Sequence, residues 1–171
     1  MDPNISGRQL RLVWGLYALA GVVSALMIAQ RYMQYALHPQ DAAAASGMYA
    51  GGDLALEFIV CFLLLVPTAA LAITIRKSEP AYTLYSKVLL GLTITAPLSL
   101  VLVPIPFFSS WQLGDLLLFR LFTIPVVLFV LVCSLLLTRF AHARRFIFYA
   151  LLVEGLSLVA CFAGMLFLMR R

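Results

Sequence analysis

Two carboxylates and one arginine are the residues of this chain best placed to do chemistry, because each lies inside a long apolar stretch. Glu57, Glu154 and Arg120 are flanked by runs of aliphatic and aromatic residues. Ionisable groups in such stretches cost about 2.5–3.5 kcal/mol to insert into a bilayer, and they often bind ions or relay protons. The same groups can instead staple helices together or extend to the headgroups. Both roles stay open at this point.

A pair between Glu57 and Arg120 is the first hypothesis for these charges. Glu57 follows Asp53 by four residues, and Arg120 follows Asp115 by five. If each aspartate is the N-cap of its helix, both charges lie about 6–8 Å below the outer interface. Arg31, near the end of the first apolar stretch, is expected to join this group with Asp53.

Glu154 is predicted to lie near the bilayer midplane, about 13 Å along its helix from Arg145. No Lys or Arg is expected at that level, although Arg120 reaches it if the helices tilt. An unpaired, dry carboxyl is expected to be neutral and to donate a hydrogen bond to a neighbouring helix. Alternatively, Glu154 faces a wet cavity and binds a cation or a proton.

Five apolar stretches must position these groups. A spanning helix needs about 20 mostly apolar residues, and the candidate spans are residues 10–37, 54–75, 82–103, 116–138 and 146–169. The first stretch is longer than the apolar part of a signal peptide, so we expect it to stay uncleaved. The 171 residues are therefore predicted to form a single transmembrane domain, an all-α membrane helix bundle with five transmembrane helices.

The composition makes lipid the main solvent of the chain. Apolar residues are 64% and charged residues 11% of the sequence, against about 45–50% and about 25% in soluble domains. Eight of the 12 Lys and Arg residues fall on the side of the N-terminus, which predicts a cytoplasmic N-terminus and a C-terminus outside. We therefore expect an integral protein of the plasma (cytoplasmic) membrane. The net charge of +5 is a topology signal, so no nucleic-acid partner is expected.

Small residues recur at intervals of four, the pattern that lets helices approach closely in lipid. The faces expected to point inward carry Gly21, Ala25 and Ala29 in the first stretch, and Gly91, Thr95 and Ser99 in the third. In the fifth stretch, Glu154 shares such a stripe with Ser157, Cys161 and Gly164. Kinks are expected where proline interrupts a stretch, at Pro67, Pro97 and Pro125. Near Pro97, Thr93 and Thr95 are expected to help satisfy the freed backbone.

The residue types give no support for cofactor or metal chemistry. His38 and His142 fall in loops on opposite sides, so they cannot hold one haem together, and no CxxC motif is present. Cys61, Cys133 and Cys161 are expected to pack as small apolar residues. The leading hypothesis is a non-catalytic subunit or scaffold of a membrane assembly. Its expected partners are the lipid bilayer and a second membrane protein or another copy of the chain.

Two alternatives remain open. The first is a small transporter or channel element that uses Glu154, with Glu57 and Arg120 near its outer mouth. The second is a membrane enzyme in which the aromatic loop 107–111 acts as a lid over a lipid-soluble substrate.

Overall fold

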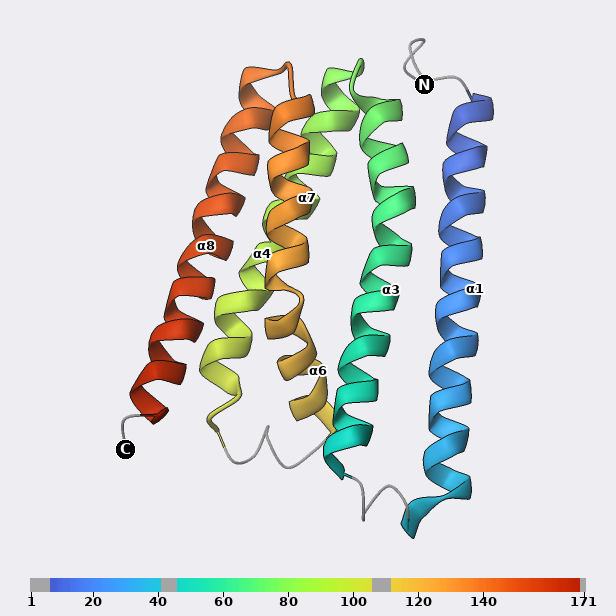
Figure 1. Ribbon diagram of the computed structural model, residues 1–171. Coiled ribbons are helices and arrows are strands. Elements are labelled where there is room, and N and C mark those ends of the chain that lie inside the picture. The colour runs from blue at the N-terminus through green and yellow to red at the C-terminus, as the bar shows by residue number, and fades with distance from the viewer. Residues whose placement is uncertain (1–6, 41–45, 106–111, 170–171) are drawn as a thin grey trace. The chain divides into compact units, whose positions relative to one another are not determined.

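The computed structural model describes residues 7–40, 46–105 and 112–169, and all regular structure in these ranges is helical (Figure 1). The helices in these ranges are α1 (Gly7–Leu37), α3 (Ser46–Ile75), α4 (Glu79–Leu102), α6 (Gln112–Phe122), α7 (Ile124–Leu137) and α8 (Ala141–Met169). The predicted all-α fold is confirmed. In the described ranges, four helices are long and apolar enough to cross a membrane, and α6 with α7 makes a fifth if this bent pair is one span.

The chain divides into two compact units, which are described separately. The α1–α3 unit covers Ser6–Leu71, and the four-helix unit begins at Ala72 and holds α4, α6, α7 and α8. Within the four-helix unit, α4 and α8 run in the same direction and α7 runs against them (Figure 1). The turn before α4 and the turn between α7 and α8 therefore lie at one end of this unit. Both turns are basic, with Lys77 and Arg139 as examples.

The seam between α4 and α8 is the main core of the four-helix unit. The buried residues of these two helices recur at alternating intervals of four and three: Tyr82, Ser86, Leu89, Thr93 and Ala96 on α4, and Ala143, Ile147, Ala150, Glu154 and Ser157 on α8; of these, Tyr82 donates to the Ser134 carbonyl of α7. This repeat of about 3.5 residues keeps one face of each helix against its neighbour. Small side chains dominate the seam, so the backbones can come close and gain dispersion contacts that lipid cannot supply.

In the α1–α3 unit, the backbones of α1 and α3 come close at far fewer positions than those of α4 and α8. Long side chains therefore make the contacts between α1 and α3. The hydroxyls of Tyr17 and Thr68 lie 3.0 Å apart, and Arg31 bonds to Asp53. The α1 residues that are buried or that reach α3 recur at intervals of four and three: Val13, Tyr17, Ala20, Ser24, Met27 and Arg31.

The face of α1 that was predicted to pack inward is not the face that α1 buries. Gly21, Ala25 and Ala29 are exposed, and a Cβ added at Gly21 would meet nothing within 4 Å. The buried face lies one residue earlier in the helical register, because the polar bonds of Tyr17 and Arg31 fix how α1 is turned.

The predicted packing stripe of α4 is also only partly buried. Ser99 is 2% exposed, whereas Gly91 and Thr95 are exposed. The buried face of α4 instead contains Thr93 and Ala96. The rotation of α4 about its axis that buries these two residues also buries the bulkier Tyr82 and Leu89.

The two aspartates expected to be N-caps lie inside helices, because every helix begins before its predicted apolar span. α3 begins at Ser46 and α6 at Gln112, so Asp53 and Asp115 lie inside helices and are not N-caps. The predictions placed each start where the apolar run starts. A helix can continue beyond the hydrocarbon into the headgroup region, where polar and small residues are tolerated.

The three prolines have different outcomes. α3 and α4 continue through Pro67 and Pro97, whereas the predicted fourth span breaks at Thr123, with 48° between α6 and α7. Pro125 therefore lies in the first turn of α7 rather than in a helix interior. The hydroxyls of Thr93 and Thr95 donate to the carbonyls of Leu90 and Leu92. They are thus not engaged with the Thr93 carbonyl that Pro97 leaves free.

Candidate functional site

Arg120 occupies the last turn of α6, directly before the break at Thr123. A cation near the C-terminal end of a helix is favourable because the free carbonyls there carry partial negative charge. The Thr123 hydroxyl donates to the Arg120 carbonyl over 2.8 Å and so satisfies one of these groups. Pro125 suits the start of α7, since its missing N–H would have had no helical partner there. The break thus follows from local chemistry and presents Arg120 at its edge.

The Arg120 guanidinium ties three helices together. Its Nη2 donates to Oε2 of Glu154 on α8 over 2.8 Å, and its Nε donates to the Thr95 hydroxyl on α4 over 2.7 Å. Weaker contacts at 3.3 and 3.4 Å reach the Thr123 hydroxyl and the Leu92 carbonyl. The side chains of Arg120 and Glu154 are 12% and 0% exposed. The result is a buried, charge-neutral centre where α4, α6 and α8 meet.

This pairing corrects the expectation that no cation lies at the level of Glu154. The residue count had placed Arg120 five positions below a helix start at Asp115. Although α6 begins at Gln112, Arg120 is still five residues past Asp115; the count did not include the reach of the long side chain, whose Nη2 lies 2.8 Å from Oε2 of Glu154. Glu57, the partner first proposed for Arg120, lies in α3 of the other unit, and the Glu57–Arg120 pair stays a prediction. Glu154 was expected to be neutral because no cation was expected beside it. The arginine at 2.8 Å gives this carboxyl a counterion.

One oxygen of Glu154 is left without a partner. Oε1 is buried and accepts no hydrogen bond from any part of the chain that the structure describes. A buried acceptor without a donor costs about 1–3 kcal/mol, and more when it is charged. By residue count Glu154 is about 20 Å from the start of α8 and about 22 Å from its end, hence near mid-span. This oxygen can accept a proton, a hydrogen bond or a cation.

A second polar cluster joins α1 and α3. Arg31 Nε donates to Asp53 Oδ1 over 2.6 Å, and Nη2 donates to the Tyr49 carbonyl over 2.6 Å. Nη1 donates to Gln34 over 3.1 Å, and the Tyr35 hydroxyl donates to the other Asp53 oxygen. The rings of Tyr35 and Tyr49 lie 5.0 and 4.8 Å from the guanidinium carbon, so the cation is also held by aromatic faces.

Sequence reasoning brought Arg31 and Asp53 together but missed the residues around both clusters. Tyr35 follows Arg31 by four residues, and Tyr49 precedes Asp53 by four, which places each pair on one helix face. Thr123 follows Arg120 by three in the same way. This spacing was the signal available in the sequence.

The remaining candidate residues form no further centre in the described ranges. No group of three His, Cys, Asp or Glu residues there could hold a metal ion, and the three cysteines are free. The side chain of Asp115 and the aromatic loop 107–111 lie outside what the structure describes. Comparisons of the chain with protein families, with curated proteins and with solved structures gave no match.

Proposed function

We propose that this chain is a non-catalytic subunit or scaffold of a membrane assembly. The observation that carries the proposal is the internal pairing of its buried charges, Arg120 with Glu154. Charges that neutralise each other inside one chain can fix how its helices pack. Such pairs are not displayed to a soluble substrate. They therefore support a structural role better than a catalytic one.

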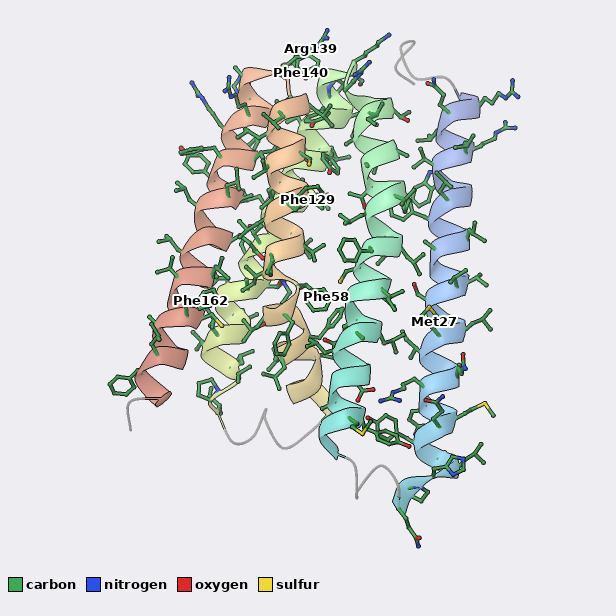
Figure 2. All side chains as sticks on the ribbon, viewed as in Figure 1. Met27, Phe58, Phe129, Arg139, Phe140 and Phe162 are labelled. Atoms are coloured by element: carbon green, nitrogen blue, oxygen red, sulfur yellow. The ribbon has the colours of Figure 1, made fainter. Side chains whose placement is uncertain are left out.

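The outward faces support a partner in the plane of the membrane. On α1, the exposed side carries large apolar residues such as Leu26, with Gly21, Ala25 and Ala29 among them. On the four-helix unit, Phe129 and Phe162 are each 60% exposed (Figure 2). Lipid covers such surfaces, and small residues among them allow a second helix to approach closely.

Two glycines on α1 allow a matched test of this surface. A Cβ at Gly15 or at Gly21 would meet nothing within 4 Å, so a side chain at either position starts in open space, and circular dichroism checks that both leucine variants fold. The two residues lie about 120° apart around the helix. The chain is purified in a mild detergent, and the mass of the complex is measured. We expect a stoichiometric partner, or a second copy, with the native chain and with Gly15→Leu but not with Gly21→Leu. A native chain that purifies as a monomer contradicts the proposal.

A small transporter or channel element is the second candidate, and a specific observation favours it. Glu154 Oε1 is buried without a hydrogen-bond donor in the described residues, and its partner Arg120 stands at a break in a candidate span. Broken helices at mid-membrane form the ion sites of many transporters. In this proposal Glu154 takes up a proton or a cation beside Arg120, which the structure pairs with it; the expectation that Arg120 lies near an outer mouth is therefore dropped, and the same expectation for Glu57 stays a prediction.

The transport hypothesis is tested with Glu154→Gln, which keeps the size of the side chain but removes its charge. The chain is reconstituted into vesicles holding a pH-sensitive dye, and proton flux is followed after a potential is applied. We expect flux with the native chain and none with Glu154→Gln, while the mass of the purified complex stays unchanged. Absence of flux through the native chain excludes proton transport by this chain alone.

A further inference from the structure

An open groove of about 230 Å³ runs between α1 and α3 within the α1–α3 unit. At one end it is lined by Gln30, Arg31 and Gln34. At the other end it is lined by apolar residues, among them Met27, which is labelled in Figure 2, and Ile59. Since α1 runs toward its C-terminus through the polar residues, the polar end faces the nearby helix ends and the apolar end faces the membrane interior. The groove therefore has the polarity of one bilayer leaflet.

The depth of Arg31 agrees with a headgroup position. α1 has 31 residues and is about 46 Å long, whereas the hydrocarbon core is about 30 Å thick. A centred helix therefore extends about 8 Å beyond the core at each end. Arg31 lies six residues, about 9 Å, before Leu37 at the end of α1. Its guanidinium is thus at the boundary between acyl chains and phosphates.

Hydrogen bonds inside this cluster consume its acceptors and leave donors. Both carboxylate oxygens of Asp53 and the Tyr49 carbonyl each accept a bond. The amide oxygen of Gln34 accepts from Arg31, which leaves the amide N–H groups of Gln34 available. Each terminal nitrogen of Arg31 carries two hydrogens and uses one in the bonds described. The surplus of donors suits a ligand that offers only acceptors, such as a phosphodiester.

The Arg31 guanidinium is also held in place in advance. It lies over the rings of Tyr35 and Tyr49, and the absence of a side chain at Gly52 makes room for it. A Cβ at Gly52 would be 2.8 Å from Arg31 Nη2, which is too close for both to keep their places. A planar guanidinium fixed in this way loses little freedom when it binds a phosphate.

We propose that this groove binds one phospholipid of the surrounding bilayer through its phosphate. The phosphate accepts hydrogen bonds from Arg31 and Gln34, and one acyl chain follows Met27 and Ile59 toward the membrane interior. The groove is open rather than enclosed, and its volume is below that of pockets that enclose a small molecule, about 300–1,000 Å³, so it suits part of a larger molecule that extends into the bilayer. The bilayer supplies an occupant with the polarity and the acceptors that the groove requires.

The proposal is tested by native mass spectrometry of the full chain released from nanodiscs of equal phosphatidylglycerol and phosphatidylcholine. We expect one retained phospholipid per chain. Gln34→Glu keeps an acceptor for Arg31 but replaces the free amide donors with negative charge, so retention should fall about tenfold or more. Met27→Trp fills the apolar end and should have a similar effect. Leu12→Trp is the control, because Leu12 is 63% exposed and does not line the groove; it should retain the lipid.

Three results would overturn the proposal. The first is a native chain that retains no phospholipid from these nanodiscs. The second is unchanged retention in both Gln34→Glu and Met27→Trp when circular dichroism shows that they fold. The third is displacement of the lipid by millimolar glycerol phosphate, which would mean that the site takes a free phosphate and not a lipid.

Discussion

Removing either partner of the Arg120–Glu154 pair should destabilise the four-helix unit, and the two losses should differ in kind. The carboxylate is fully buried and the arginine side chain is 12% exposed, so water does little to replace a lost partner. Breaking a pair of this type costs about 3–5 kcal/mol. Glu154→Leu leaves an arginine that cannot give up its proton. Arg120→Met leaves a carboxyl that can gain one.

This difference makes the stability of only one of the two variants depend on pH. In Arg120→Met, the folded chain holds a proton on Glu154 that the unfolded chain releases at neutral pH. The folded state then binds more protons than the unfolded state, so its stability rises by about 1.4 kcal/mol for each unit that the pH falls. The gain ends near pH ~4.3, where the unfolded carboxyl is protonated too. The stability of Glu154→Leu should stay constant over the same range, because neither state changes its charge at this site.

Free energies of unfolding are measured by SDS titration in mixed micelles, following the separation of dyes on α4 and α8. Between pH 7.5 and 5.5, Arg120→Met should recover about 2–3 kcal/mol relative to Glu154→Leu. The double variant, which removes both charges, should be more stable than either single variant, with a coupling of at least about 2 kcal/mol. Additive losses with no difference in pH response would show that the two groups do not interact in the membrane, and the reasoning from their burial would fail.

Three further substitutions test the helix packing and the lipid groove. Ala150→Leu overfills the α4–α8 seam and should lower the free energy of unfolding by about 1–3 kcal/mol in the same SDS titration; unchanged stability would place this seam elsewhere. Tyr17→Phe should cost less than about 1.5 kcal/mol, because Thr68 keeps its bond to the Leu64 carbonyl, and a larger loss would mean that Tyr17 has another role. Gly52→Ala should move the Arg31 guanidinium and lower phospholipid retention in the native mass measurement, whereas equal retention would show that the close contact is easily relieved.

Helix existence was the part of the fold that the sequence could predict. A run of about 20 apolar residues has no stable alternative in lipid, since every backbone polar group must be satisfied within the segment. Helix starts were not predictable from the same pattern, as Asp53 and Asp115 show. Hydropathy marks the edge of the hydrocarbon, whereas a helix begins where its backbone hydrogen bonds begin. For α3 and α6 these first residues are Ser46 and Gln112.

The packing faces show why the pairing of helices was harder to predict. Small residues at intervals of four occur on both α1 and α4, but these helices bury the neighbouring register, with Ala20 and Ser24 in one and Thr93 and Ala96 in the other. Small residues permit close approach without requiring it. Which face is used depends on contacts with the facing helix, and one sequence pattern read along one helix does not contain that information.

The break at Thr123 shows how the error about Glu154 could have been avoided. A straight span starting at Asp115 keeps Arg120 near the interface and leaves Glu154 without a counterion. Arg120, Thr123 and Pro125 are nevertheless the parts of a helix end: a cation in the last turn, a hydroxyl that satisfies its carbonyl, and a proline that starts the next helix. A helix that ends inside a membrane exposes polar backbone, which is tolerated only where protein or a water-filled cavity covers it. The buried arginine and carboxylate at that level are therefore linked to the break by the same requirement, and a deep charge in one span should prompt a search for a helix break in the next.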